Sequence, residues 1–277
     1  MRIDAHQHFW NYDSARDTWI TDEMSVLKKD YLPGDLRPDL SANGFDGSIA
    51  VQADQSEQET RFLLGLAEQH PFIAGVVGWV DLTAPDVEER LASFGACEKL
   101  RGFRHIVQSE PDDQFMLRAE FRRGISCLSR FGFTYDLLIY PRQLPAAVRL
   151  AADHPTQKFV LDHIAKPEIR TRRLEPWATH VRQLASLPNV FCKVSGLVTE
   201  ADWNNWQPAD FKPYLEVVFE SFGTDRLMFG SDWPVCLLGG SYAQVRQVIA
   251  EFLTNCSTRE QDKIFGINAA RCYGLKN

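Results

Sequence analysis

None of the six cysteines in this 277-residue sequence belongs to a CxxC pair, and all six are scattered along the chain. Disulfide frameworks are typical of short, cysteine-rich secreted chains, and structural zinc sites need closely spaced cysteine or histidine pairs. The cysteine pattern therefore excludes a disulfide framework and a cysteine-based structural zinc site, and we expect free thiols.

Long apolar runs and an N-terminal leader are also missing. No stretch approaches the ~20 apolar residues that cross a bilayer, and residues 1–6 lack the basic and apolar regions of a secretory signal peptide. The 37 acidic and 30 basic residues give a net charge of −7, which disfavours nucleic acid and anionic membranes as partners. We expect a cytoplasmic protein that binds neither nucleic acid nor membranes.

The composition is that of an ordinary globular protein. Hydrophobic residues make up 44% and charged residues 24% of the chain, so a large core can be buried. The sequence has no internal repeat, low-complexity tract or flexible linker, and its length is close to the ~250 residues typical of one α/β barrel. We therefore expect a single domain spanning residues 1–277.

Short apolar segments alternate with longer amphipathic segments, which is typical of βα units. Eight short segments are predicted to be strands, at residues 3–8, 47–54, 74–82, 100–107, 133–140, 158–163, 189–195 and 226–232. Helical patterns occupy residues 56–69, 85–100, 115–131, 143–153, 174–187, 210–222 and 242–253, with a last helix from 258. This alternation favours an α/β fold, a TIM-type (β/α)₈ barrel, with a doubly wound open sheet as the alternative.

One interval lacks a helical pattern. Residues 9–46 separate the first two predicted strands and contain Trp10, Tyr12, Trp19 and Tyr31. Structureless loops of this length are usually functional or disordered, and four aromatic residues argue against disorder. We predict a loop that covers a site; a purely structural excursion is the alternative.

Titratable side chains stand at the predicted ends of three strands. His6 and His8 end the first strand, His163 ends the sixth, and Asp232 ends the eighth. Catalytic groups of parallel barrels lie at the carboxyl ends of the strands, and residues two apart on a strand point the same way. Barrel closure would place the first strand beside the eighth, so the four side chains are predicted to converge. Singly, each has an ordinary explanation, such as Asp232 capping the next helix.

Five segments stand out as motifs: Asp4-Ala5-His6-Gln7-His8-Phe9-Trp10, Gly102-Phe103-Arg104-His105, Leu161-Asp162-His163-Ile164-Ala165-Lys166-Pro167, Cys192-Lys193-Val194-Ser195-Gly196-Leu197 and Phe229-Gly230-Ser231-Asp232-Trp233-Pro234. Together they resemble the amidohydrolase superfamily, in its sugar-lactonase-like branch of L-fuconolactonases and related 2-pyrone-4,6-dicarboxylate lactonases. The resemblance spans essentially the whole chain. It implies a (β/α)₈ barrel, lactone hydrolysis, and catalytic roles for His6, His8, His163 and Asp232.

The sequence departs from the two-metal members of this superfamily. Those members take a bridging lysine or glutamate from strand four and a histidine from strand five. Here strand four ends in Arg104-His105 and strand five in Leu138-Ile139-Tyr140, so a two-metal site is not expected. Three imidazoles and a carboxylate suit one zinc ion, and the site could equally work without a metal. No cofactor is obligatory, and at most one divalent ion is expected, on His6, His8, His163 and Asp232.

The residue types indicate how a lactone would be opened. Asp232, anionic at neutral pH, is predicted to take a proton from the attacking water as general base and to return it to the departing ring oxygen. His6, His8 and His163 are predicted to polarise the carbonyl oxygen, as hydrogen-bond donors or through one metal ion.

Three further residues are predicted to contact the substrate. Arg104 lies in a buried strand and needs a partner, while Trp10 and Trp233 could form an apolar wall for a sugar ring. A surface ion pair for Arg104 and simple packing for the tryptophans are the alternatives. The role of His105 stays open, as does that of Lys193, which either lines the pocket or pairs with Asp162.

The expected substrate is a neutral aldonolactone such as L-fuconolactone. A dicarboxylate would call for several basic residues at the mouth, and Arg104 is the one clear candidate. The main alternative is a mononuclear zinc-dependent decarboxylase of the same superfamily. A non-catalytic binding barrel is disfavoured, because buried titratable groups gathered at one point usually serve a reaction. The sequence does not indicate an oligomeric state.

Overall fold

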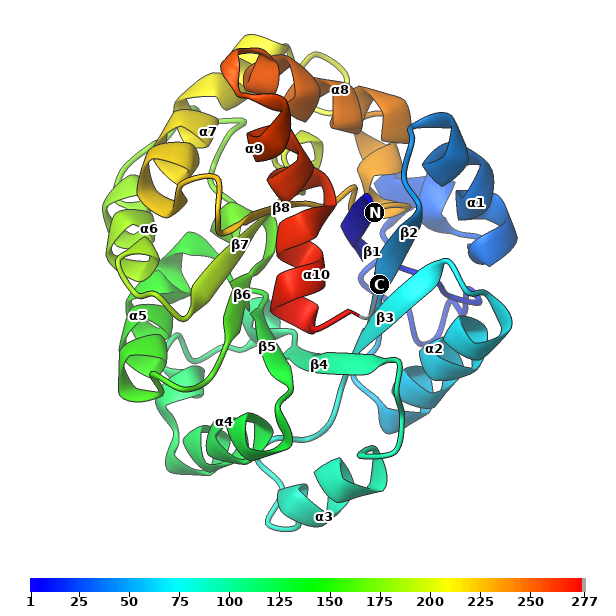
Figure 1. Ribbon diagram of the computed structural model, residues 1–277, viewed down its shortest axis with the longest axis vertical. Helices are drawn as coiled ribbons and strands as arrows, with labels where there is room; N and C mark the ends of the chain where they lie inside the picture. The colour runs from blue at the N-terminus through cyan, green and yellow to red at the C-terminus, as the bar shows by residue number, and fades with distance from the viewer. Residues whose placement is uncertain (276–277) are drawn as a thin grey trace.

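Eight parallel strands form one sheet whose spatial order follows the chain. The computed structural model describes residues 1–275, and neighbouring strands pair in the order β1 to β8 (Figure 1). The strands are β1 (Ile3–Gln7), β2 (Gly47–Val51), β3 (Ile73–Gly78), β4 (Leu100–His105), β5 (Thr134–Leu137), β6 (Phe159–Leu161), β7 (Val190–Val194) and β8 (Leu227–Phe229). All eight predicted strands are confirmed, although each ends earlier than predicted.

The sheet is closed between its first and last strands. Gln7 forms a parallel bridge with Trp233. The Asp232 amide donates to the His6 carbonyl at 2.8 Å, and the His8 amide donates to the Trp233 carbonyl at 2.7 Å. The predicted (β/α)₈ barrel is therefore confirmed, and the open-sheet alternative is wrong.

Helices surround the ring of strands (Figure 1). They are α1 (Pro33–Ala42), α2 (Glu57–Gln69), α3 (Val87–Ser93), α4 (Ala119–Phe131), α5 (Leu144–Asp153), α6 (Trp177–Ala185), α7 (Pro208–Phe222), α8 (Tyr242–Phe252), α9 (Thr258–Asp262) and α10 (Asn268–Tyr273). The helix predicted over residues 85–100 is shorter in the structure, where only α3 is helical, because the chain turns at Phe94 and Gly95 before β4. None of the described helices is long and apolar enough to cross a membrane.

The segment between β1 and β2 is more ordered than its sequence predicts. It contains the 3₁₀ helix η1 (Asp22–Leu27) and the helix α1, neither of which the sequence pattern predicts. α1 begins with Pro33 and Gly34 and contains Pro38, and such residues normally mark turns. Trp19 and Met24 from this segment line the cavity described below, which agrees with the predicted covering role.

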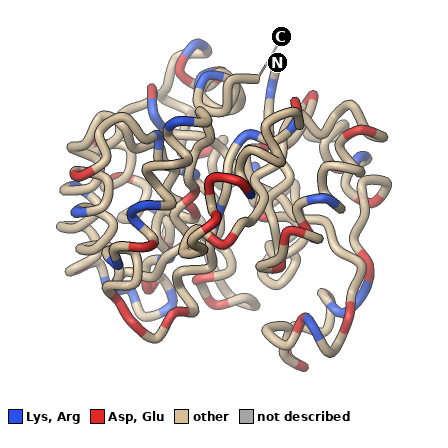
Figure 2. Tube along the Cα trace, turned by 90° about the horizontal axis from the view of Figure 1, so that it is seen from below, with Lys and Arg blue, Asp and Glu red and all other residues tan. Residues whose placement is uncertain are grey.

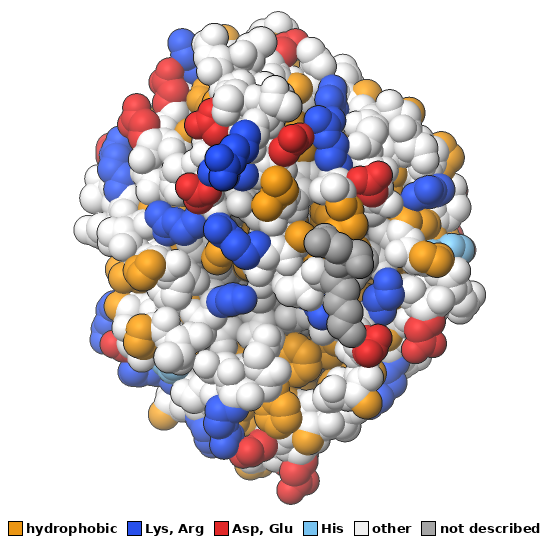
Figure 3. Space-filling view, in the orientation of Figure 1, with side chains coloured by type: hydrophobic (Ala, Val, Ile, Leu, Met, Phe, Trp, Pro, Cys, Tyr) orange, Lys and Arg blue, Asp and Glu red, His pale blue; other side chains and the backbone are white. Residues whose placement is uncertain are grey.

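The C-terminal helices cover the end of the barrel at which the strands begin. α9, the π-helical turn η9 (Lys263–Ile267) and α10 run across this end (Figure 1). The N-terminus lies there (Figure 2), and charges of both signs are interspersed on this face (Figure 3). The opposite end, where the strands finish, is therefore left to carry a site.

Candidate active site

A cavity of about 520 Å³ lies at the carboxyl ends of the strands, and its wall includes His8, His163 and Asp232. This volume falls within the range of small-molecule sites. His8 follows β1, His163 lies in the turn η5 (Asp162–Ala165) after β6, and Asp232 follows β8. Three of the predicted catalytic residues therefore stand just beyond strand ends rather than on the strands.

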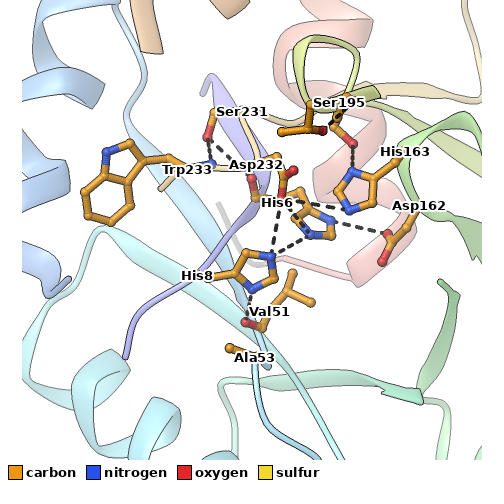
Figure 4. Close-up of polar contacts among 12 residues, drawn as sticks. His6, His8, Val51, Ala53, Asp162, His163, Ser195, Ser231, Asp232 and Trp233 are labelled. Carbon is orange, nitrogen blue, oxygen red and sulfur yellow. Dashed lines mark hydrogen bonds and ion pairs between the residues drawn. The ribbon is translucent and has the colours of Figure 1, made fainter. Parts of the chain in front are cut away.

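The four predicted catalytic side chains converge on one point (Figure 4). Asp232 Oδ1 lies 3.4 Å from His8 Nε2, 3.8 Å from His6 Nε2 and 3.9 Å from His163 Nε2. The two nitrogens His6 Nε2 and His8 Nε2 are 3.1 Å apart. All four residues are buried, so the charge of the carboxylate acts on the imidazoles through little water.

Two of these side chains stand on left-handed backbone. The φ angles are 59° at Asp232 and 52° at His163, a conformation that costs a residue other than glycine about 1–2 kcal/mol. The buried Asp4 carboxylate fixes the turn before Asp232, because it accepts hydrogen bonds from the Ser231 amide at 2.9 Å and the Tyr242 hydroxyl at 3.1 Å. The barrel interior thus holds the Asp232 side chain in its place.

The protonated nitrogen of His8 is set by its neighbour. His8 Nδ1 lies 2.8 Å from the Val51 carbonyl oxygen, which only accepts hydrogen bonds, so Nδ1 carries the proton and Nε2 presents a lone pair to the cavity. His6 Nδ1 lies 3.3 Å from both Asp162 Oδ1 and Lys193 Nζ. His6 Nε2 lies 3.3 Å from Arg104 Nη1, which only donates, so the same tautomer is favoured. As neutral rings, His6 and His8 both direct unprotonated Nε2 atoms toward Asp232.

His163 differs from the other two histidines. Its Nδ1 lies 2.9 Å from Ser195 Oγ, and a hydroxyl can donate as well as accept. With Ser195 donating to Nδ1, a neutral His163 carries its proton on Nε2, the atom that faces Asp232. His163 is therefore the imidazole best suited to donate a hydrogen bond to a substrate oxygen.

The donor set fits one metal ion. Ligand atoms of His6, His8 and Asp232 all lie within 4.8 Å of one another. Tetrahedral zinc holds its donor atoms roughly 3.4 Å apart, close to the observed separations. Two lone pairs facing each other at 3.1 Å repel unless a proton or a cation lies between them. His163 is not part of this group of three, but forms a second candidate group with His6 and Asp162.

Burial sets the protonation states of the site. It lowers the pKa of His8, and lowers the pKa of His6 and of His163 well below the usual 6.5. Burial alone would raise the pKa of Asp232, but the neighbouring imidazoles of His163 and His8 outweigh it and hold that pKa below its usual value. At neutral pH the site therefore presents neutral imidazoles around a carboxylate.

Arg104 lines the cavity, but its guanidinium already has protein partners. Nη1 donates to Asp162 Oδ2 at 2.9 Å, and Nη2 donates to Gln52 Oε1 at 2.8 Å. The side chain is only 3% exposed, so the alternative of a surface ion pair is wrong. A substrate contact by Arg104 stays a prediction, and its charge is already balanced by Asp162.

The structure assigns Lys193 to the barrel interior. Its Nζ lies 2.5 Å from Asp136 Oδ2 and 3.0 Å from Asp162 Oδ1, and all three side chains are fully buried. Of the two roles that the sequence leaves open for Lys193, the structure has the pairing with Asp162. The contact of Lys193 with Asp136 could not be predicted from sequence, because Asp136 lies on β5, two strands away from β7.

The remaining predicted residues are divided between the cavity and its surroundings. Trp10 lines the cavity. The ring of Trp233 points away from the three imidazoles (Figure 4) and packs edge-on against Tyr31. His105 lies at the end of β4, with Nε2 2.7 Å from Glu110 Oε1 and its ring stacked on Phe115. His105 therefore fixes the chain after β4, outside the group of catalytic side chains.

The chain matches the family model described as amidohydrolase over residues 3–275. An L-fucono-1,5-lactonase of Burkholderia multivorans is 44% identical, in an alignment covering 99% of this chain and 96% of that protein. An L-fucono-1,5-lactonase of Burkholderia ambifaria is 36% identical over equal shares. The crystal structure of an amidohydrolase from Burkholderia multivorans with bound zinc has a TM-score of 0.96 at 45% identity, with 100% of both chains covered. The chain described here belongs to the amidohydrolase family.

Proposed function

We propose that this protein hydrolyses a small sugar lactone, and that the substrate is a neutral aldonolactone of the L-fucono-1,5-lactone type. The observation that carries the proposal is the Asp232 carboxylate, which lies 3.4–3.9 Å from three imidazole nitrogens and lines a cavity of about 520 Å³. The names of the relatives favour a lactonase over the decarboxylase alternative.

Asp232 acts as the general base in this mechanism. It takes a proton from a water molecule whose oxygen attacks the lactone carbonyl carbon. His163, oriented by Ser195, donates a hydrogen bond from Nε2 to the oxygen that becomes negative in the tetrahedral intermediate. The bond from the carbonyl carbon to the ring oxygen then breaks, and Asp232 returns its proton to that oxygen. The products are a carboxylic acid and a free hydroxyl.

His6, His8 and Asp232 are the residues that would hold a zinc ion. When bound, such an ion supplies a Lewis acid and lowers the pKa of water. The Val51 carbonyl keeps the proton of His8 on Nδ1, so that Nε2 offers its lone pair to such an ion.

Metal analysis of the purified protein should find at most one divalent ion per chain. His8→Ala should bind less zinc after equilibration, because it removes one of three ligands. His70→Ala, at the end of the outer helix α2, serves as the control and should bind as much as the wild type. Two ions per chain would mean that β4 or β5 supplies ligands that this assignment omits.

A panel of lactones, followed with a pH indicator because each turnover releases an acid, identifies the substrate class. Neutral aldonolactones should give the highest kcat/KM, and 2-pyrone-4,6-dicarboxylate should be hydrolysed poorly, because Asp162 already balances the Arg104 charge. A preference for the dicarboxylate would contradict the proposed substrate class. Absence of turnover across the panel would contradict the proposed function.

A further inference from the structure

The turn after β6 has an unusual backbone. His163, Ile164, Ala165 and Lys166 have successive φ angles of 52°, 48°, 61° and 47°. Each such residue costs about 1–2 kcal/mol relative to right-handed backbone. The turn is held by Trp177, whose Nε1 donates to the Ile164 carbonyl at 2.7 Å. Strain of this kind is concentrated at functional sites.

Both ends of this turn contribute to the cavity wall. His163 at its start has a place in the proposed mechanism, whereas Lys166 at its end lines the same cavity without an assigned role. Glu200, at the end of the 3₁₀ helix η6 (Val198–Glu200) after β7, also lines the cavity. Lys166 Nζ lies 3.8 Å from Glu200 Oε1.

The charged groups of Lys166 and Glu200 are available to a ligand. Their separation of 3.8 Å is too long for a hydrogen bond, and within residues 1–275 neither group has a hydrogen-bond partner. The side chains are 19% and 23% exposed, so part of each is accessible from the cavity. A partly exposed pair of this kind contributes little to stability, and its N–H donors and carboxylate acceptors remain unused.

The chemistry of the pair favours hydroxyl groups. A hydroxyl accepts a hydrogen bond from an ammonium and donates one to a carboxylate, so neighbouring hydroxyls on a sugar ring can satisfy both groups. A carboxylated ligand would instead meet the repulsion of Glu200. Trp10, Trp19 and Trp203 line the same cavity, and aromatic rings pack well against the apolar C–H side of such a ring.

We propose that Lys166 and Glu200 bind ring hydroxyls of the lactone and thereby select a neutral polyhydroxylated substrate. This inference rests on the proposed function. It adds two specificity-determining residues to the catalytic group around Asp232.

Steady-state kinetics of Lys166→Met and Glu200→Gln test the assignment with two substrates. One is the best aldonolactone of the panel, and the other is δ-valerolactone, which has no ring hydroxyls. Each substitution should raise KM for the aldonolactone roughly 10- to 100-fold, the range for a hydrogen bond to a charged group, and change kcat less. Turnover of δ-valerolactone by the variants should equal that of the wild type, whether that turnover is high or barely measurable.

Two sets of controls accompany these variants. Lys212→Met removes a pair of similar length, with Lys212 Nζ 3.7 Å from Glu216 Oε1 on the exposed side of α7, and should leave both constants unchanged. Lys166→Arg and Glu200→Asp retain the charges and should recover part of the affinity. They also serve if the first pair of variants does not fold.

Three results would overturn the inference while leaving the proposed function intact. They are unchanged KM for the aldonolactone, a fall in kcat at unchanged KM, and equal losses on both substrates. The last two would place the pair in the chemical step or in the architecture of the site. A wild type that hydrolyses no lactone overturns the proposed function and this inference together.

Discussion

Asp232→Asn should lower lactone hydrolysis by roughly 10²–10⁴-fold, the contribution expected of a general base. The amide keeps the shape of the side chain but cannot take a proton from water. KM should change far less, because His163 and the cavity wall remain. In the wild type, kcat/KM should be constant near neutral pH and fall in acid, because the active carboxylate has a pKa below 3.8 and the pKa values of the buried imidazoles are also lowered.

Asp225→Asn is the matched control for this variant. Asp225 precedes β8 at the other end of the barrel, where it is exposed and paired with Lys263, so turnover should be unchanged. Near-normal turnover by Asp232→Asn would exclude Asp232 as the base and implicate His163. Loss of substrate binding would instead identify Asp232 as a structural residue or a metal ligand, which metal analysis of the variant distinguishes.

The barrel and its four catalytic side chains could be predicted from sequence because both depend on local patterns. Strands buried on both faces give short apolar runs, and amphipathic helices give the longer pattern between them. Once eight βα units are counted, the carboxyl ends of the strands must meet at one end of the barrel. His6, His8, His163 and Asp232 could therefore be brought together without knowledge of any contact.

The supporting residues could not be predicted, because their partners are distant in sequence. The Asp4 carboxylate accepts a hydrogen bond from the amide of Ser231, 227 residues away. The Ser195 hydroxyl forms a hydrogen bond with His163, 32 residues away. The sequence shows Lys166 only as one residue of a motif. Its place in the cavity wall depends on a left-handed turn over residues 163–166, which contain no glycine to predict such a turn. The helix α1 could not be predicted because it contains Pro33 and Pro38, and proline normally marks a turn.

The interior of the barrel carries a buried network of charges beneath the site. Lys193 Nζ lies between Asp136 and Asp162, at 2.5 Å and 3.0 Å from their carboxylate oxygens. Arg104 also pairs with Asp162 at 2.9 Å, and the Tyr273 hydroxyl of α10 donates to Asp136 at 2.7 Å. The network thus joins the C-terminal helix to the cavity, and among residues 1–275 Lys193 is the one cation that contacts both carboxylates.

Lys193→Met should lower the free energy of unfolding by about 3–5 kcal/mol, because it leaves two buried carboxylates with one cation. At about 2–4 °C per kcal/mol for a chain of this size, thermal unfolding at pH 7 should shift down by roughly 6–20 °C. Burial raises the pKa of Asp136 to about 6 even though Lys193 opposes this. Without Lys193 the pKa of Asp136 rises further, so acidification protonates Asp136 and removes its buried charge. The deficit in unfolding temperature of Lys193→Met should therefore shrink between pH 7 and about 5.

Lys212→Met, on the exposed face of α7, should change the unfolding temperature little at either pH. A deficit that grows on acidification, or one no larger than that of Lys212→Met, would mean that the buried carboxylates do not depend on Lys193 for their charge balance.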